Sequence, residues 1–338
     1  MADRSDAGDE RLAQLRTWLH EQLGGGVPPS LIPASTDASF RRYFRMTLPD
    51  GGSAIAMDSP PTREDPAPFV RIAGLLRSAG LHVPRIRASD VEQGYLLLED
   101  LGSETYLERL ADCDPEPLIH DALDALVQLQ AATQADELPR YDETLLRGEL
   151  DLFTEWYVRR HLRHEPPPHW WADWENTCTT LIAAVQAQPA VWVHRDFTPR
   201  NLMLAEPNPG VIDFQDAVLG PVTYDWVSLV RDAFISWPLE TERRWLFAYR
   251  ERALAAGIAI PSQPLDLQRA VDFTAAQRHL KVIGIFARLY HRDGKTGYLA
   301  DVPRFLRYLE RETADWPELA PLRAVLAHLP APVGSASR

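Results

Sequence analysis

One stretch of the sequence, residues 190–216, limits the possible folds more than any other part of the chain. It contains three short apolar runs separated by polar segments, at 191–193, 202–204 and 211–212. Such runs, bounded by polar turns, are typical of strands that present polar side chains at their ends. We therefore expect Asp196, Asn201 and Asp213, which follow the first run or flank the other two, to be held on a rigid frame.

The spacing of these three residues suits the transfer of a phosphoryl group. Asp196 and Asn201 lie at the two ends of one loop, and Asp213 follows twelve residues after Asn201. A hydroxyl nucleophile needs a carboxylate to accept its proton, and nucleotide phosphates need Mg²⁺ held by carboxylate and amide oxygens. The other interpretation is an acidic turn that only caps strands. Three such groups, each beside an apolar run, favour a catalytic role.

The residues around these groups are similar to two kinase motifs. His194-Arg-Asp196 followed by Asn201 resembles the kinase catalytic loop, and Asp213-Phe-Gln215 resembles the metal-binding Asp-Phe-Gly, with Gln in place of Gly. The resemblance implies an α+β, bilobal, protein-kinase-like fold with a small β-rich N-lobe and a larger, mostly helical C-lobe.

Length and composition are those of a globular protein with two domains. The chain has 338 residues, of which 45% are hydrophobic and 25% charged. It has no apolar run of 18 residues and no basic leader, so we expect a cytoplasmic protein without a membrane span. A net charge of -13 argues against binding nucleic acid. We expect a monomer that acts on a small molecule.

The first part of the chain predicts the small lobe. Apolar periodicity indicates helices at 9–23 and 67–79 and strands at 40–47, 53–57 and 95–99. In the strand at 40–47, alternation separates Phe40, Arg42, Phe44 and Met46 from Arg41, Tyr43 and Arg45.

An apolar strand then runs into a polar turn containing Gly102, as a connection between two lobes does. Extended backbone offers alternating donors and acceptors. The backbone groups of Leu98, Glu99 and Leu101 are therefore candidates to bind the edge of an adenine ring, and the alternative is an ordinary strand end.

The remainder is predominantly helical in pattern. Helices are predicted at 116–132, 143–162, 170–187, 222–235, 239–256, 264–291 and 302–312. We expect an N-lobe over 1–101, a C-lobe over 102–331 and a disordered tail over 332–338.

Several separate segments carry a closer resemblance. They include Asp37-Ala-Ser-Phe-Arg-Arg-Tyr-Phe-Arg45, Leu96-Leu-Leu-Glu-Asp-Leu-Gly102, Gly220-Pro-Val-Thr-Tyr-Asp225 and Arg278-His-Leu-Lys281. With the catalytic loop, they resemble the aminoglycoside phosphotransferase and choline kinase superfamily. Within it, they are most similar to the bacterial anomeric kinases of cell-wall recycling, which phosphorylate N-acetylmuramate and N-acetylglucosamine at C1.

This resemblance implies a role for each matching residue. Asp196 is the catalytic base, and Asn201 and Asp213 hold Mg²⁺ beside ATP. Asp225 matches the position that anchors the catalytic-loop backbone in kinase-like folds, so we expect a structural role. His194 is likewise expected to brace the loop rather than to transfer protons.

The small lobe departs from the wider superfamily in its cations. Residues 33–45 contain no glycine, and lysine occurs only at 281 and 295, so the usual phosphate-binding lysine is missing. Arginine can bind phosphate oxygens in bidentate fashion. We expect at least one of Arg41, Arg42 and Arg45, with Ser39, to replace the missing groups, unless these arginines are merely solvated.

A basic stripe is predicted on the helix at 264–291. Arg278, Lys281, Arg288 and Arg292 recur at helical spacing on an otherwise largely apolar helix. A buried cation must meet an anion. The stripe therefore either binds a substrate carboxylate, such as the lactyl group of N-acetylmuramate, or forms internal ion pairs. The substrate candidates are Asp216, Arg231, Lys281 and Arg288.

Two other functions remain open at this stage. A kinase for another alcohol, such as an aminoglycoside, choline or homoserine, would use the same catalytic loop. Alternatively, the missing lysine and glycines would suit a pseudokinase that binds a nucleotide without catalysis, although all three catalytic-loop and metal-binding residues are retained.

Overall fold

We analysed a computed structural model of the chain, which describes residues 6–25, 30–34 and 40–330. Two compact units are present. The first contains the described residues up to Arg109 together with Arg200–Asp216, and the second contains Leu110–Pro199 and the described residues from Ala217 onward. The expected boundary lay at residue 101. The predicted tail, 332–338, lies outside the described residues.

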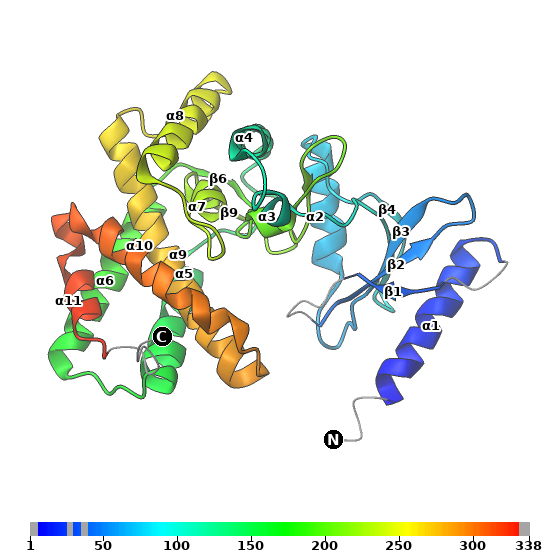
Figure 1. The fold of residues 1–338 in the computed structure, drawn as a ribbon, viewed down its shortest axis with the longest axis horizontal. Helices are drawn as coiled ribbons and strands as arrows, with labels where there is room; N and C mark the ends of the chain where they lie inside the picture. The colour runs from blue at the N-terminus through cyan, green and yellow to red at the C-terminus, as the bar shows by residue number, and fades with distance from the viewer. Residues whose placement is uncertain (1–5, 26–29, 35–39, 331–338) are drawn as a thin grey trace. The chain divides into compact units, whose positions relative to one another are not determined.

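The first unit is built on an antiparallel sheet of five strands (Figure 1). Their order in the sheet is β1 (Ile32–Pro33), β2 (Arg42–Thr47), β3 (Ser53–Asp58), β5 (Tyr95–Glu99) and β4 (Ile86–Asp90). A tight turn joins β2 to β3, and Gly51 adopts φ 87° there. The sequence Pro-Asp-Gly in this turn is a strong turn signal.

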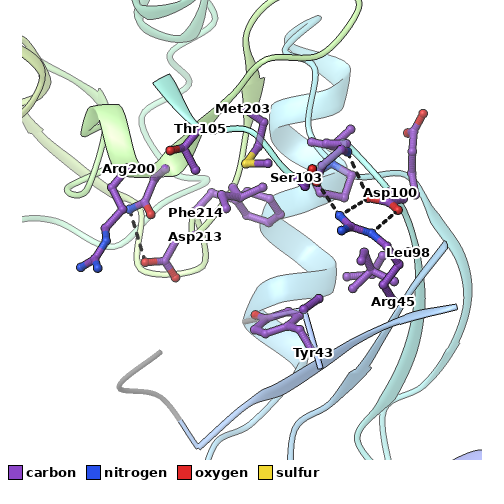
Figure 2. Close-up of a pocket in the computed structure, with 18 of the residues that line it drawn as sticks. Tyr43, Arg45, Leu98, Asp100, Ser103, Thr105, Arg200, Met203, Asp213 and Phe214 are labelled. Atoms are coloured by element: carbon purple, nitrogen blue, oxygen red, sulfur yellow. Dashed lines mark hydrogen bonds and ion pairs between the residues drawn. The ribbon is translucent and has the colours of Figure 1, made fainter. Parts of the chain in front are cut away.

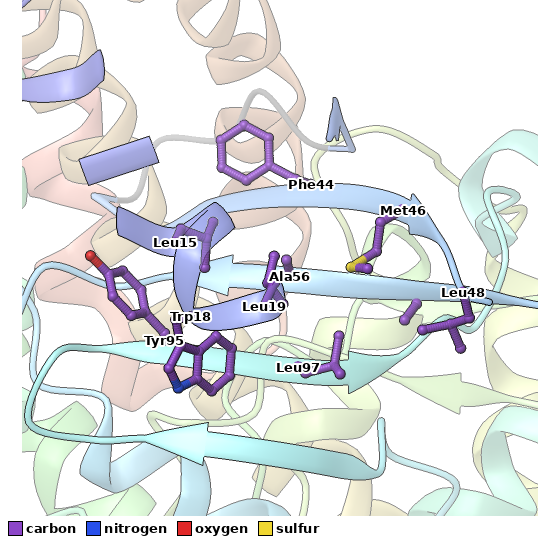
Figure 3. Close-up of a cluster of buried hydrophobic side chains, with 10 residues drawn as sticks. Leu15, Trp18, Leu19, Phe44, Met46, Leu48, Ala56, Tyr95 and Leu97 are labelled. Atoms are coloured by element: carbon purple, nitrogen blue, oxygen red, sulfur yellow. The ribbon is translucent and has the colours of Figure 1, made fainter. Parts of the chain in front are cut away.

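One face of this sheet packs against helix α1 (Asp6–Gln22). Leu15, Trp18 and Leu19 of α1 are buried against Phe44 and Met46 of β2 (Figure 3). These strand residues alternate with Tyr43 and Arg45 because successive side chains of a strand point to opposite faces. The opposite face of β2 is therefore free to line a cavity, which confirms the predicted alternation.

The segment 200–216 groups with the first unit because its hairpin packs on it. Strands β7 (Leu202–Met203) and β8 (Gly210–Val211) pair with each other, and the Val211 N–H donates to the His82 carbonyl at 2.7 Å. A Cβ atom at Gly210 would lie 2.9 Å from the Leu101 side chain. A larger residue at this position would therefore require the Leu101 side chain to move, and glycine avoids this. Helix α2 (Ala67–Ser78) adds a ring contact between Phe69 and Phe214, with centroids 4.8 Å apart.

The second unit is mostly helical. Its α-helices are α4 (Pro115–Ala131), α5 (Glu143–Leu152), α6 (Pro168–Gln186), α7 (Tyr224–Val230), α8 (Leu239–Ala255), α9 (Pro264–Asp293), α10 (Val302–Ala314) and α11 (Ala320–Ala327). A two-stranded ribbon pairs β6 (Ala190–Val193) with β9 (Val218–Pro221), and the loop that contains Asp196 follows β6. None of the described helices is long and apolar enough to span a membrane.

Helix α9 is the central helix of this unit and packs against α5, α6 and α10. It also contacts η1 (Phe153–His161), a π-helical continuation of α5. A Cβ atom at Gly284 would lie 2.4 Å from the backbone of Leu152. The missing side chain at Gly284 therefore lets the two helices approach closely, next to the point where the α-helix widens into π-helix.

The predicted elements agree with the structure in type, with differences in detail. The helix predicted at 143–162 is divided into α5 and η1, and the one predicted at 222–235 is shortened to Tyr224–Val230. Strands β4 and β9 were not predicted. Strand β4 has a half-exposed pattern without a continuous apolar run, and β9 contains Gly and Pro, which are depleted in strands.

Candidate active site

A cavity in the first unit has a volume of about 340 Å³ and contains the predicted metal ligands. Figure 2 shows that β2, β5 and the 200–216 segment all contribute side chains to it. Its lining includes Tyr43, Arg45, Ile55, Leu98, Glu99, Leu101, Asn201, Met203, Asp213 and Phe214. The predicted metal ligands and the predicted adenine-binding segment therefore share one cavity within one unit.

The segment that follows β5 is fixed by Arg45. Its guanidinium binds the Asp100 carboxylate through two contacts of 2.7 and 2.9 Å and donates to the Gly102 carbonyl at 2.6 Å (Figure 2). Burial alone would raise the pKa of Asp100, but the hydrogen bonds, first of all that from Arg45, lower it below its ordinary value. Arg45 is thus an anchor of this segment, which differs from the phosphate contact we expected.

The backbone of this segment is only partly available to a nucleotide. The Glu99 N–H donates to the Arg85 carbonyl at 2.8 Å. Leu98 lies within the sheet, opposite Ile55 of β3 and Ile86 of β4. The Glu99 carbonyl and the backbone groups of Leu101 remain the candidates for adenine recognition.

Asn201 and Asp213 lie beside each other at the end of the β7–β8 hairpin. The Asn201 Nδ2 is 3.5 Å from Asp213 Oδ2, and the Ile212 N–H donates to the Asn201 carbonyl at 3.1 Å. Gln215 donates to Asp213 Oδ1 at 3.0 Å. Asp213 itself has φ 63°, a left-handed conformation that non-glycine residues rarely adopt. The backbone is therefore strained at the residue that presents the carboxylate, as is common at functional sites.

Asp196 lies in the second unit, in the loop that follows β6. Its side chain is 47% exposed, and Arg278 of α9 lies 3.8 Å from its Oδ1. The loop is held by Asp225 of α7, whose carboxylate accepts the backbone N–H groups of His194 at 2.6 Å and Arg195 at 3.0 Å. Asp225 thus occupies the anchoring position that we expected for it.

The pKa of the buried Asp225 carboxyl is raised well above its ordinary value. Burial raises its pKa to about 7, against the lowering effect of the two backbone hydrogen bonds, and the neighbouring Asp196 raises it further. The His194 ring accepts the Asp196 N–H at 3.2 Å, so His194 braces the loop as well.

The sequence did not reveal a buried ionic cluster next to this loop. Glu149 of α5 binds Arg195 and, at 2.9 Å, Lys281 of α9. Lys281 also donates to the Tyr224 hydroxyl at 3.1 Å. Arg195 has φ 75°, so the loop backbone is strained here as well. The only sequence signal for this cluster is the basic stripe on α9, which does not identify its acidic partner.

The phosphate-binding candidates lie in different environments. Arg42 points to the α1 face, where Asp58 binds both it and Arg11. This position is away from the cavity, so Arg42 is not a nucleotide contact. Arg41 points to the other face and pairs with Glu64. Ser39 lies outside the described residues.

The predicted substrate-binding residues also lie in different environments. Lys281 forms the internal ion pair described above, which was the second of its two expected roles. Arg231 is buried and bound by Glu242, Asp272 and Glu312 at 2.9–3.0 Å, so these ion pairs favour a structural role over the substrate contact that we expected. The sequence does not indicate these three acidic partners, which lie on α8, α9 and α10.

Asp216 and Arg288 keep their place as candidates. Asp216 accepts a hydrogen bond from Gln215 at 3.3 Å. Arg288 is half-buried on α9, and its pKa is lowered by burial and by the neighbouring Arg292.

Comparison with known proteins identifies the family. The model of the phosphotransferase enzyme family matches residues 30–259, which is more than half of the chain. The chain belongs to this family. A curated relative from Pseudomonas aeruginosa, N-acetylmuramate/N-acetylglucosamine kinase, is 53% identical and covers 95% of this chain and 98% of its own. A protein of the same name from Neisseria meningitidis is 43% identical over 95% of this chain and 96% of its own.

Solved structures of other family members share the fold. The gentamicin complex of APH(2")-IIa aligns with a TM-score of 0.60 at 15% identity, covering 87% of this chain and 96% of that one. Choline kinase LicA from Streptococcus pneumoniae aligns with a TM-score of 0.60 at 10% identity, covering 88% and 99%. The predicted kinase-like fold and the predicted superfamily are thereby confirmed, and the protein is a phosphotransferase with an alcohol group as acceptor.

Proposed function

We propose that the protein transfers the γ-phosphoryl group of ATP to the anomeric hydroxyl of N-acetylmuramate, N-acetylglucosamine or both, as a step in the recycling of peptidoglycan. The observation that carries this proposal is identity of 43–53% over nearly the full length of relatives named for these two sugars. Asp196, Asn201 and Asp213, at the spacing that phosphoryl transfer requires, support it.

The nucleotide is assigned to the cavity of the first unit. Leu98 and Met203 give it apolar walls for an adenine ring, and the backbone of Glu99 and Leu101 offers the edge contacts. Arg45 keeps this segment in place through Asp100. A cavity of about 340 Å³ is in the range of small-molecule sites.

The donor set at the other end of the cavity fits Mg²⁺. Asn201 supplies an amide oxygen and Asp213 a carboxylate, both of which line the cavity. Magnesium is commonly bound through one or two protein oxygen donors plus phosphate oxygens and water, so these two residues suffice. Within the described residues, no group of three or more His, Cys, Asp or Glu side chains forms a different metal site. When bound, the ion would neutralise charge on the transferred phosphoryl group.

Asp196 is assigned the role of general base, which accepts the proton of the sugar hydroxyl. Its carboxylate is 47% exposed, and Asp225 fixes the loop backbone just before it, at His194 and Arg195. Arg278 lies 3.8 Å from the Asp196 Oδ1. A carboxylate placed next to a substrate hydroxyl can accept its proton as a general base. Asp216 and Arg288 are assigned to the sugar, and a lactyl carboxylate is the group that Arg288 would bind.

A coupled assay of ADP release tests the proposal. N-acetylmuramate and N-acetylglucosamine should each be compared with an aminoglycoside, choline and homoserine as acceptors. We expect turnover with the N-acetyl sugars and a phosphorus NMR signal from phosphate on the anomeric carbon. Phosphate on another hydroxyl would indicate a kinase for a different alcohol. Nucleotide binding without turnover of any acceptor would indicate a pseudokinase.

A further inference from the structure

The first unit must supply a cation for the nucleotide phosphates without any lysine. Kinases of this fold place a lysine on the third strand and pair it with a glutamate on the following helix. Here the equivalent strand, β3, reads Ser-Ala-Ile-Ala-Met-Asp, and the chain has no lysine before residue 281. Helix α2 contains no glutamate either.

The strand register places Arg41 on the cavity face, next to the end of β3. Strands β2 and β3 are antiparallel, with Tyr43 opposite Met57 and Arg42 opposite Asp58. Residue 41 continues this register and shares its face with Tyr43, because side chains alternate along an extended chain. Tyr43 lines the cavity (Figure 2), so Arg41 is a diagonal neighbour of Met57 on the cavity side of the sheet.

The contacts of Arg41 resemble those of the missing lysine. Its guanidinium pairs with Glu64 at 2.6 Å, and its side chain is only 6% exposed. Glu64 lies in the turn that precedes α2, so the acid comes from just outside the helix rather than from within it. The Arg41 Nη1 lies 3.5 Å from the Tyr43 hydroxyl.

Electrostatic effects connect Arg41 to the predicted metal site. Burial would lower the pKa of Arg41, but Tyr43, Glu64 and Asp213 together raise it above its ordinary value. Burial raises the pKa of Tyr43 to about 12, so its hydroxyl remains a donor at neutral pH. The Asp213 carboxylate is thus one of the charges that act on the Arg41 guanidinium.

We infer that Arg41 binds a phosphate group of the nucleotide and that Glu64 is its positioning residue, so that an arginine–glutamate pair from β2 and the α2 turn replaces the lysine–glutamate pair. This inference rests on the proposed use of ATP. Of the three arginines around β2, Arg42 is taken by Asp58 and Arg45 by Asp100. Arg41 is paired with an acid on the cavity side, as a phosphate-binding kinase lysine is.

Binding measurements with adenosine and ADP separate this role from a structural one. A residue that contacts phosphate affects ADP but not adenosine, whereas loss of local structure weakens both. For Arg41→Ala, we expect the Kd for ADP, measured by calorimetry, to rise about 10-fold or more, because hydrogen bonds to charged groups are strong. The Kd for adenosine should stay within about twofold of that of the wild-type protein.

Further variants test the pairing. Arg41→Lys should recover part of the ADP affinity, because it retains the charge. Glu64→Gln should weaken ADP binding by less than Arg41→Ala, and the double variant should be no weaker than Arg41→Ala, because the two residues act together. Arg42→Ala, from the opposite face of the same strand, is the matched control and should leave both Kd values within about twofold.

Equal ADP affinity in wild type, Arg41→Ala and Arg41→Lys would overturn the inference, and so would a parallel loss of adenosine and ADP binding. The proposed function fails separately, if the wild-type protein binds ADP but phosphorylates no N-acetyl sugar. Circular dichroism of each variant shows whether it is folded. If Arg41→Ala does not fold, Arg41→Lys and Glu64→Gln provide the same comparison of the two ligands.

Discussion

At the scale of single residues, the strongest chemical assignment is that of Asp196. Its carboxylate is the exposed acid of a loop whose backbone is fixed by Asp225. We expect Asp196→Asn to lower kcat by about 10² to 10⁴, the range for loss of a general base. The KM for ATP should change little, because the proposed nucleotide cavity is lined by the first unit. Steady-state kinetics of the coupled reaction measure both values, and a kcat within about threefold of wild type would remove Asp196 from this role.

The raised pKa of Asp225 leads to a prediction of how the unfolding free energy depends on pH. Its pKa is about 7 in the folded protein, raised by burial, and an unfolded aspartate has a pKa near 3.9. Between these values the folded state holds a proton that the unfolded state has lost. The contribution of Asp225 to stability is therefore full below about pH 4, falls as the pH rises and is lost by about pH 7.

Replacement by asparagine removes this titration. Between pH 5 and 7, the unfolding free energy of the wild type should fall relative to that of Asp225→Asn by about 1 kcal/mol per pH unit. Above about pH 7.5 the difference between the two proteins should be constant. Urea unfolding of both proteins across this range measures it. A difference that is independent of pH would show that the carboxyl titrates normally.

The arginines near β2 show how far residue-level prediction from the sequence extends. Alternation along the strand placed Arg41 and Arg45 on one face and Arg42 on the other, and this is confirmed. The sequence does not indicate their partners, because Asp58, Glu64 and Asp100 lie on other elements. Pairing across elements decides which arginine is available for phosphate, and this requires the fold.

At the scale of elements, α9 is held to its neighbours by a buried charge cluster. Arg231, which ends α7, binds Glu242 of α8, Asp272 of α9 and Glu312 of α10. His279 of α9 also contacts Glu312 at 3.0 Å. Four helices of the second unit thus meet at one guanidinium whose side chain is only 2% exposed.

Removal of this guanidinium should destabilise the protein. We expect Arg231→Ala to lower the unfolding free energy by about 3–5 kcal/mol, because buried carboxylates lose their partner. Arg311→Ala is the matched control. Arg311 binds the same Glu242 from a more exposed position and should cost up to about 1 kcal/mol. Chemical denaturation measures both, and a raised KM for the sugar with unchanged stability would restore Arg231 as a substrate contact.

The elements also show why some predictions from the sequence were incomplete. Long periodic segments such as α4 and α9 were predicted to within a few residues, because their apolar periodicity extends over many turns. The π-helix η1 was not predicted, since the helical periodicity of the segment does not distinguish an α-helix from a π-helix. The backbone of α5 approaches Gly284 of α9 there, and the sequence of 153–161 alone does not show this contact.

At the scale of the whole molecule, the first unit consists of two segments that are not consecutive in the sequence. The segment 200–216 belongs to the first unit, although the 90 residues of Leu110–Pro199, which precede it, belong to the second unit. The expected boundary at residue 101 assumed that each part of the fold is continuous in sequence. The pairing of Val211 with His82 and the contact of Phe214 with Phe69 are the interactions that break this continuity.

This division predicts which backbone amides a nucleotide protects. ADP bound in the cavity of the first unit should slow hydrogen exchange in three segments that are distant in sequence, around 42–58, 95–102 and 200–214, since all three line that cavity. A ligand that binds only the folded state also stabilises it, by about 2.7 kcal/mol at a concentration of 100 times its Kd. Mass spectrometry of exchanged peptides, with and without ADP, measures the pattern.

Helix α8 provides the internal reference for this experiment, because it belongs to the second unit and contributes nothing to the cavity. Adenosine should protect 95–102 as ADP does. Protection at 200–214 should depend on the phosphates, because Asn201 and Asp213 are the proposed metal ligands near them. Protection by ADP that is confined to 95–102 would mean that the 200–214 hairpin takes no part in nucleotide binding, and the assignment of Asn201 and Asp213 to the metal would fail with it.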